Sequence, residues 1–350
     1  MLNLCLNSDK INSTIGCLGT GPLYEKALEK KLEVKLLNTK DFLNGGALAY
    51  IVDMGFDVVD FHGAKAFFLN KLIAKKMSIP SVATVHSNYR QDFLNSGMKH
   101  LIFTPLSITG LKSFNYYICV SKYIDNLLNT EGFKGRKFVV SNGMDFKGVQ
   151  LKESREQIRA SLGINSWDFV YVMVARLHPV KNHKRLINAF TRLKLEFKDT
   201  RLLLIGDGSL LEQLKSIAPE GVIFAGFREN PADYINASDI SVLSSLSEGG
   251  APPLVILESA AVKKTAAVSR VGDMPEIISS GSGFLFDPCS EEEIYEKLKE
   301  AYLNRNRLPE MGEALHSAAV EMYSMDKFCS GYSAAYNSII EDYNGKKDEK

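Results

Sequence analysis

The stretch FVYVMVARLHPVKNHKRLINAF, residues 169–190, runs from an apolar segment through a short polar turn into a helical pattern. Residues 169–175 are apolar at every position, which is typical of a strand buried on both faces of a parallel sheet. From residue 186 onward, apolar residues recur at the spacing of one face of a helix. A buried strand followed directly by a helix is the repeating unit of an α/β fold.

The same alternation continues along most of the chain. Short apolar runs are expected to form strands, and the segments between them carry helical patterns. The predicted strands are 33–37, 57–62, 81–86, 116–121, 137–143, 169–175, 201–206, 222–226, 239–245 and 265–269. The sequence therefore predicts an α/β protein with doubly wound parallel sheets.

A polar connection near residue 150 separates two such series, and Ser154 and Gln157 after it have the spacing of a capping box. We expect a first Rossmann-like domain over 1–148 and a second over 149–325. A C-terminal helix with a polar tail, 326–350, is expected to return to the first domain. The carboxyl ends of the strands would then face a central cleft.

Composition excludes several classes of protein. The 350 residues carry a net charge of +1, which gives no reason to expect a nucleic-acid partner. The five cysteines are scattered and form no C-x-x-C motif, so we expect reduced thiols and no zinc site. The chain starts without a signal-peptide pattern and has no apolar run of roughly 18 residues. We predict a cytoplasmic protein, at most attached peripherally to the inner face of the cell membrane.

Arg176 and Lys181 flank the turn between the strand and the helix of the opening stretch. Two cations at the end of a strand, beside a helix N-terminus, suit a diphosphate. Taken alone, cations in a solvated loop explain the pattern at least as well. Gly206 and Phe227 lie in loops that follow other predicted strands, and ordinary tight turns would also explain these.

In a doubly wound sheet, however, the loops after the strands emerge at one edge. There they would hold a nucleoside diphosphate. Glu258, expected in the first turn of a helix that begins near Pro253, would accept hydrogen bonds from ribose hydroxyls, and Glu248 from sugar hydroxyls.

Five segments in this order and at these intervals resemble the donor domain of glycosyltransferase family 4. Members of that family are retaining enzymes of the GT-B fold, which has two Rossmann-like domains. The bacterial members that build surface polysaccharide are the most similar. The segments are ARLHPVKNHKRLINAF (175–190), LLLIGDGSLLEQLK (202–215), FAGF (224–227), DISVLSSLSEGGAPPLVILESAA (239–261) and SRVGDMPEII (269–278).

The resemblance implies a hexosyltransferase that moves a sugar from a nucleotide-diphosphate sugar, first of all a UDP-sugar, with retention of configuration. It implies a glycan or lipid-linked acceptor, bacterial surface polysaccharide as the product, and neither a cofactor nor a metal. The catalytic residues would be His86 and Glu248, with His86 across the cleft beside the reacting centre. The donor-binding residues would be Arg176, Lys181, Gly206, Phe227, Gly249, Gly250, Leu254 and Glu258.

The remaining histidines give weaker functional signals. His62 is a weaker candidate that would line the acceptor side, and from the residues alone His86 is a hydrogen-bonding loop histidine. We expect His100, His178, His183 and His316 to be surface or turn residues, because their spacing fits no metal site.

The chain departs from the family pattern in two places. Glu248 and Glu258 are ten positions apart, where family members usually have eight. Residues 19–28 look like a segment that follows the second strand, so we expect the first β–α unit to be missing or remodelled. These departures motivate a second hypothesis, a catalytically weak nucleotide-sugar-binding partner subunit of an active transferase.

Two further classes are disfavoured. A solute-binding protein would need an export signal, and a dehydrogenase would need G-x-G-x-x-G after its first strand. Residues 97–114 are apolar with lysines at intervals, which fits either a contact with an anionic membrane surface or a core-facing pair of helices.

Overall fold

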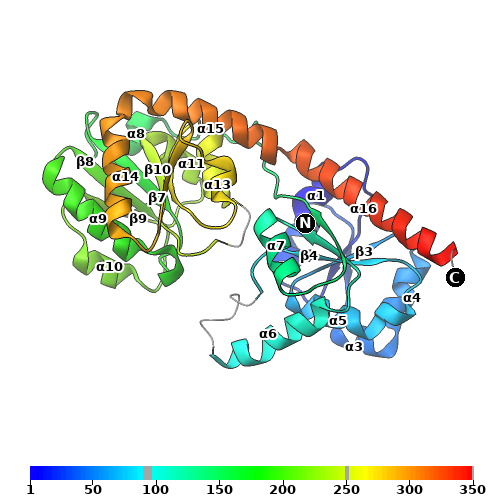
Figure 1. Cartoon of the computed structure of the whole chain (residues 1–350). Coiled ribbons are helices and arrows are strands. Elements are labelled where there is room, and N and C mark those ends of the chain that lie inside the picture. Colours follow the sequence, from blue (N-terminus) through cyan, green and yellow to red (C-terminus); the bar gives the residue numbers. More distant parts are fainter. Residues whose placement is uncertain (90–96, 249–251, 349–350) are drawn as a thin grey trace. The chain divides into compact units, whose positions relative to one another are not determined.

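The computed structural model describes residues 1–89, 97–248 and 252–348, with the side chains of 97–103 outside the description. The chain divides into two compact units (Figure 1). The first unit comprises Met1–Gly143 and Met325–Lys350, and the second comprises Met144–Ser324. Each unit is described by itself below.

The second unit contains a six-stranded parallel sheet in the order β12-β11-β10-β7-β8-β9. From β7 the strand order runs outward in both directions, which is the doubly wound Rossmann order, and it reverses between β7 and β10. The strands are β7 (Phe169–Val174), β8 (Thr200–Ile205), β9 (Val222–Gly226), β10 (Ile240–Leu243), β11 (Ala266–Ser269) and β12 (Gly283–Phe286).

Helices cover both faces of this sheet because its central strands are apolar on both sides. Tyr171 and Met173 of β7 pack into the core with α9 and α14, whereas Val170 and Val172 pack with α8 and α11. The helices of this unit are α8 (Arg155–Ser161), α9 (His183–Glu196), α10 (Leu211–Ile217), α11 (Pro231–Ala237), α12 (Leu254–Ala261), α13 (Met274–Ile277), α14 (Glu291–Leu303) and α15 (Leu308–Tyr323).

The first unit has a four-stranded parallel sheet in the order β3-β4-β5-β6 and a separate two-stranded parallel sheet, β1-β2. Its strands are β1 (Ile15–Cys17), β2 (Val34–Leu36), β3 (Val59–His62), β4 (Ser81–Val85), β5 (Tyr116–Cys119) and β6 (Arg136–Val139). Its helices are α1 (Leu2–Asn7), α2 (Pro22–Glu29), α3 (Thr39–Asn44), α4 (Gly46–Asp53), α5 (Ala64–Ile73), α6 (Gly97–Leu111), α7 (Lys122–Thr130) and α16 (Met325–Asp348).

The long C-terminal helix α16 belongs to this first unit, where it runs beside α1 and the sheet (Figure 1). Its Phe328, Tyr332 and Ile339 share a core with Val82 of β4 and Ile118 of β5. The helix therefore closes one face of the four-stranded sheet.

All ten predicted strands are present, but the structure corrects several other expectations. A strand–helix–strand unit, β1-α2-β2, precedes β3, so residues 19–28 follow the first strand of the structure. Strands β1 and β12, of three and four residues, were not predicted, although strands of the same lengths such as β2 and β3 were. The expected buried strand at 137–143 is β6, whose side chains are half-buried or exposed at a sheet edge.

Two helical segments also differ from expectation. The C-terminal segment expected to fray is helical as far as Asp348, and Lys347 Nζ donates to the Ser78 carbonyl at 2.6 Å. Residues 97–111 form one helix and not a pair. A Cβ on its Gly110 would lie 2.6 Å from the Phe67 carbonyl carbon, so this end of α6 packs closely on α5. Within the described residues, no helix is long and apolar enough to cross a membrane.

The buried guanidinium of Arg159 joins several loops by hydrogen bonds at the amino-terminal edge of the second unit's sheet. Arg159 is only 4% exposed and donates to the carbonyls of Ala237 at 2.8 Å, Asn165 at 2.9 Å and Asp168 at 2.9 Å. It also forms an ion pair with Asp239 at 3.0 Å. One side chain thus satisfies four acceptors that are largely removed from water.

Arg159→Leu should lower the free energy of unfolding of the second unit by about 3–5 kcal/mol, because it leaves buried acceptors and a carboxylate without their donor. Urea denaturation followed by circular dichroism measures the change. The matched control is Arg192→Gln, which removes an exposed ion pair with Glu292. This substitution should change the free energy of unfolding by too little to measure. Equal effects of the two substitutions would contradict the assignment.

Candidate functional site

The strand-order reversal of the second unit brings two opposite charges together. The loop after β7 carries Lys181, and the loop after the neighbouring strand β10 carries Glu248. Lys181 Nζ lies 2.6 Å from Glu248 Oε1, and the two side chains are 17% and 11% exposed. In doubly wound sheets, ligands bind at the carboxyl ends of the strands where the order reverses. Two of the expected site residues therefore meet at the place where a ligand is expected.

Backbone contacts hold this geometry. Ser244 Oγ donates to the carbonyl oxygen of Lys181 at 3.0 Å, and the Leu246 amide donates to the carbonyl of Val180 at 2.8 Å. These two bonds join the loop after β7 to the loop after β10. The approach of Lys181 to Glu248 is consequently fixed by the chain on both sides and does not depend on the ion pair alone.

Gly206 is required by the close approach of the turns after β7 and β8. Its φ is +137°, and a Cβ there would lie 2.1 Å from the Ala175 carbonyl oxygen. The Leu177 amide also donates to the Asp207 carbonyl at 2.9 Å across these turns. Arg176 in the first turn is exposed, and its guanidinium has no hydrogen bond or ion pair with the described part of the chain. Gly206 thus shapes the turn from which Arg176 projects.

The remaining expected donor-binding residues lie at the same edge of the sheet. Glu258 is the fifth residue of α12, which begins at Leu254 with Pro253 as its N-cap, so it lies on the second turn and not on the first as expected. Burial raises the pKa of Glu258, and its carboxylate has no partner among residues 1–89, 97–248 and 252–348. Leu254 and Phe227 are 60% and 73% exposed, so each offers apolar surface to a ligand. Gly249 and Gly250 lie outside the described residues.

His183, expected to be a surface or turn residue, is instead buried at the first position of α9. It is 1% exposed, and neither ring nitrogen has a described partner. Burial and the nearby charge of Lys181 lower its pKa to about 4. The sequence carried a signal for this position, because His183 precedes Leu186, Ile187 and Phe190 at helical spacing on the apolar face.

The other described histidines of this unit have different surroundings. His178 accepts a hydrogen bond from the Val180 amide at 3.4 Å, as a turn residue does. His316 is half-buried on α15 with Nδ1 2.9 Å from the Ala260 carbonyl, so it is not a surface residue. The side chain of His100 lies outside the described residues. Ser245, not singled out from the sequence, has a buried hydroxyl for which no described atom is a partner.

His86 belongs to the first unit, where it follows β4 and stacks on His62 at the end of β3. The ring centroids are 5.1 Å apart, and His62 Nδ1 lies 2.7 Å from His86 Nε2. On its other side, His62 Nε2 lies 3.3 Å from Asp60 Oδ2. The carboxylate of Asp60 also accepts from Thr84 Oγ1 at 2.7 Å and from the Tyr336 hydroxyl at 2.7 Å.

The pKa values in this group follow from burial and from these bonds. Burial alone would raise the pKa of Asp60, but His62, Tyr336 and Thr84 together lower it. Part of the His86 surface reaches solvent, yet desolvation by the surrounding protein and the charge of His62 lower its pKa to about 4. Sequence reasoning missed Asp60 and Tyr336. The only signal for Asp60 was its place two residues before His62 on one face of a strand.

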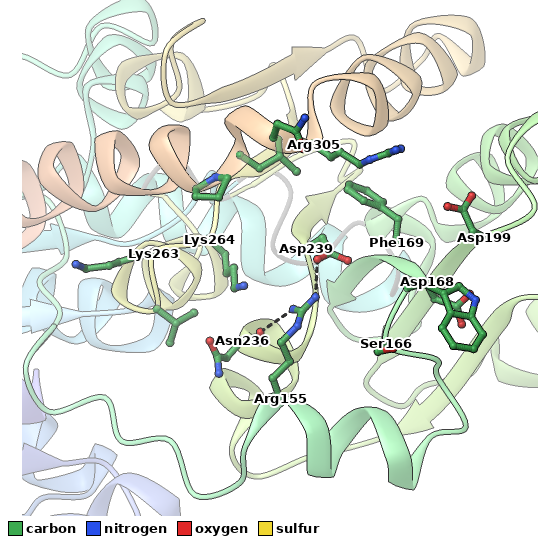
Figure 2. A pocket seen from close by; sticks show the side chains of 15 residues that line it. Arg155, Ser166, Asp168, Phe169, Asp199, Asn236, Asp239, Lys263, Lys264 and Arg305 are labelled. Carbon is green, nitrogen blue, oxygen red and sulfur yellow. Dashed lines mark hydrogen bonds and ion pairs between the residues drawn. The ribbon is translucent and has the colours of Figure 1, made fainter.

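A cavity of the second unit lies at the amino-terminal edge of the sheet, opposite the Lys181–Glu248 pair (Figure 2). It has a volume of about 610 Å³ and is lined where strands begin, by Phe169 of β7 and by Asp199 and Asp239 just before β8 and β10. Asp239 already forms an ion pair with Arg155 at 2.6 Å. Because ligands of doubly wound sheets bind at the other edge, this cavity is not the candidate site.

No group of three or more His, Cys, Asp or Glu side chains is arranged to hold a metal ion in the part of the chain that the structure describes. Among the expected site residues that the structure describes, Arg176, Lys181, Glu248 and Glu258 carry charge at the carboxyl edge.

Comparison with known proteins identifies these features. Residues 154–318 match the model of the glycosyl transferases group 1 family, and residues 34–147 match that of glycosyltransferase family 4. The chain is 30% identical to N-acetyl-alpha-D-glucosaminyl L-malate synthase of Bacillus anthracis, over 57% of this chain and 53% of that protein. It is 26% identical to alpha-monoglucosyldiacylglycerol synthase of Streptococcus pneumoniae, over 79% of this chain and 65% of that protein. The chain thus spans less than two thirds of each of these relatives.

The fold is also similar to that of solved structures. Anabaena HepE in complex with UDP superposes with a TM-score of 0.79 at 18% identity, covering 96% of this chain and 94% of that chain. The likeness confirms the GT-B fold, with its two Rossmann-like domains. Together, the two family models cover most of both units, and the chain belongs to glycosyltransferase family 4.

Proposed function

We propose that the protein is a retaining glycosyltransferase that moves a hexose from a nucleotide-diphosphate sugar, with a UDP-sugar as the first candidate, to a glycan or lipid-linked acceptor. The observation that carries the proposal is the contact of Lys181 with Glu248 where the strand order of the second unit reverses. One side chain suits a diphosphate and the other suits sugar hydroxyls, so the two halves of a nucleotide-sugar find complementary groups side by side.

The chemistry of such a transfer requires stabilisation of the leaving diphosphate. Negative charge grows on the diphosphate as its bond to the anomeric carbon breaks, and fixed cations nearby lower the barrier. Lys181 provides a mobile charge, and Arg176 can bind two oxygens at once. The proposal needs no metal ion, because these cations can carry the charge stabilisation.

The names of the relatives support the choice of substrates. One relative is a UDP-Gal:alpha-D-GlcNAc-diphosphoundecaprenol alpha-1,3-galactosyltransferase of Escherichia coli, and a structural neighbour holds UDP and glucose. From these names we infer that this protein uses a UDP-sugar donor and acts in bacterial surface polysaccharide or glycolipid synthesis. Peripheral attachment to an anionic membrane surface is part of the proposal. Within α6, residues near Gly110 are packed on α5, so the attachment would use other residues of 97–114.

Turnover tests the proposal directly. The purified protein is incubated with UDP-, GDP- and ADP-hexoses and candidate acceptors, and NMR follows donor loss and the anomeric configuration of the product. We expect one nucleotide-sugar to be consumed with retention of configuration. Binding of a nucleotide-sugar without transfer or slow hydrolysis would favour a binding subunit of another transferase, and the enzyme proposal would fail.

The ion pair gives a second test, in which two substitutions act in opposite directions. Glu248 neutralises Lys181, so a diphosphate must compete with this carboxylate and is repelled by it. Glu248→Gln should strengthen binding of a nucleoside diphosphate by up to about tenfold, or about 1.4 kcal/mol, while it reduces transfer. Lys181→Ala and Arg176→Ala should weaken diphosphate binding, and neither should change binding of the bare nucleoside.

Isothermal titration calorimetry with the diphosphate and the nucleoside measures both effects. Weaker diphosphate binding by Glu248→Gln, or equal losses for the diphosphate and the nucleoside in Lys181→Ala, would remove these residues from the phosphate site. In the double variant Lys181→Ala/Glu248→Gln, the change in binding free energy should differ from the sum of the two single changes, because the two residues are in contact.

Glu258 is tested through the ribose. Its carboxylate, which lacks a described partner, should accept hydrogen bonds from the ribose hydroxyls, and such bonds to a charged group contribute about 1.5–3 kcal/mol. The native protein should therefore bind a ribonucleoside diphosphate more tightly than its 2′,3′-dideoxy analogue, and Glu258→Ala should abolish the difference. Glu313→Ala, at an exposed ion pair with Lys263, serves as the control. A difference that survives in Glu258→Ala would exclude the ribose assignment.

A further inference from the structure

A row of polar groups in contact with one another ends at His86 in the first unit. Starting from α16, the Tyr336 hydroxyl donates to Asp60 Oδ2, which lies 3.3 Å from His62 Nε2. His62 Nδ1 then lies 2.7 Å from His86 Nε2. Every member lies within the first unit, on β3, α16 or the turn after β4.

The ionised carboxylate of Asp60 determines which nitrogen of His62 carries a proton. Asp60 accepts hydrogen bonds from Thr84 Oγ1 and the Tyr336 hydroxyl, so its pKa stays low and it is ionised at neutral pH. A carboxylate can only accept, which requires a proton on the facing His62 Nε2. Neutral His62 therefore presents an unprotonated Nδ1 to His86.

That acceptor in turn determines the state of His86. A separation of 2.7 Å between two ring nitrogens holds one proton, and with His62 Nδ1 unprotonated the proton belongs to His86 Nε2. Neutral His86 is then left with an unprotonated Nδ1. An imidazole nitrogen without a proton is a good acceptor for a hydroxyl group.

We propose that Asp60 and His62 are positioning residues that hold His86 as a neutral imidazole, with Nδ1 free to accept a hydrogen bond from a hydroxyl of the carbohydrate substrate. Asp60 and His62 act through His86 and are not themselves in contact with substrate. The identity of the hydroxyl-bearing ligand rests on the proposed glycosyltransferase function. The protonation state of the row does not, because it follows from the first unit alone.

The same row protects His86 against acid. Burial lowers the pKa of His86, and a charge on His62, beside the carboxylate of Asp60, lowers it further. The other titratable groups that face the row are the amino group of Met1, the Cys5 thiol and the phenols of Tyr332 and Tyr336. Burial raises the pKa of both phenols, so they are neutral at neutral pH and Asp60 is the carboxylate of the row.

Nitrogen-15 NMR of histidine-labelled protein tests the row without reference to activity. The chain has six histidines, so signals can be assigned by single substitutions. We expect His86 and His62 both protonated on Nε2 at neutral pH, with a scalar coupling across the bond from His62 Nδ1 to His86 Nε2. A proton on His62 Nδ1 at neutral pH, or the absence of the coupling, would overturn the proposal.

Substitutions then test the direction of the effect. His62→Leu removes the neighbouring ring whose charge lowers the pKa of His86, so this substitution should raise that pKa. Asp60→Asn removes the anion that requires a proton on His62 Nε2, so the proton should no longer be confined to Nε2 of His62. His316→Gln, in the other unit, should leave the pKa of His86 unchanged. A pKa of His86 that is the same in His62→Leu and His316→Gln would mean that burial alone sets it and would refute the row. His62→Gln keeps a hydrogen-bond acceptor at this position. It serves as a second variant if His62→Leu does not fold.

Activity provides the final readout. Because transfer would need neutral His86, kcat should fall on the acid side as His86 is protonated. This acid limb should move to higher pH in His62→Leu, because the charge of His62 lowers the pKa of His86, and His62→Gln should retain more of kcat than His62→Leu. An unchanged acid limb in His62→Leu, with turnover intact, would refute the positioning role. Confirmed NMR behaviour without turnover of any nucleotide-sugar would instead refute the proposed function, so the two failures are distinguishable.

Discussion

The reversal of strand order between β7 and β10 is the constraint on which the second unit depends. In doubly wound sheets, chains leave two such strands toward opposite sides of the sheet, so their loops diverge. The bonds from Ser244 and Leu246 to the loop after β7 limit how far the two loops diverge here. The loops are consequently close enough for Lys181 on one to reach Glu248 on the other.

Charged side chains at the two edges of this sheet differ in how many of their hydrogen-bond partners the protein supplies. At the amino edge, the guanidinium of Arg159 is surrounded by four acceptors and is 4% exposed, so nothing remains for a ligand to bind. At the carboxyl edge, Lys181 has one described anionic partner, and Arg176 and Glu258 have none among the described residues. An unsatisfied set of charges is costly to stability and is usually retained for binding or catalysis. The guanidinium of Arg159 is therefore structural, whereas the charges of Arg176 and Glu258 can still be used by a ligand.

Much of this organisation could be predicted from the sequence, and what could not has physical causes. Long apolar runs such as 169–174 give an unambiguous signal, because burial on both faces leaves no polar position. The three-residue strand β1 has no such run and is held by its pairing with β2. The prediction for His183 is wrong because a spacing that fits no metal site says nothing about burial, whereas the helical spacing of His183 to Leu186 and Ile187 does. The contact of Asp60 with Tyr336 joins residues 276 positions apart, and no local pattern in a single sequence contains it.

The two glutamates, ten positions apart, have different surroundings, and this bears on how a ligand would be recognised. Glu258 is held by α12 and is already without a described partner, so binding to it breaks nothing. Glu248 must first release Lys181. A diphosphate that takes Lys181 leaves Glu248 half-buried and unpaired, which is unfavourable unless a donor replaces the ammonium. The hydroxyls of a sugar attached to the diphosphate are such donors. On the proposed function, the exchange of partners at Glu248 therefore favours the intact nucleotide-sugar over the nucleoside diphosphate that remains after transfer.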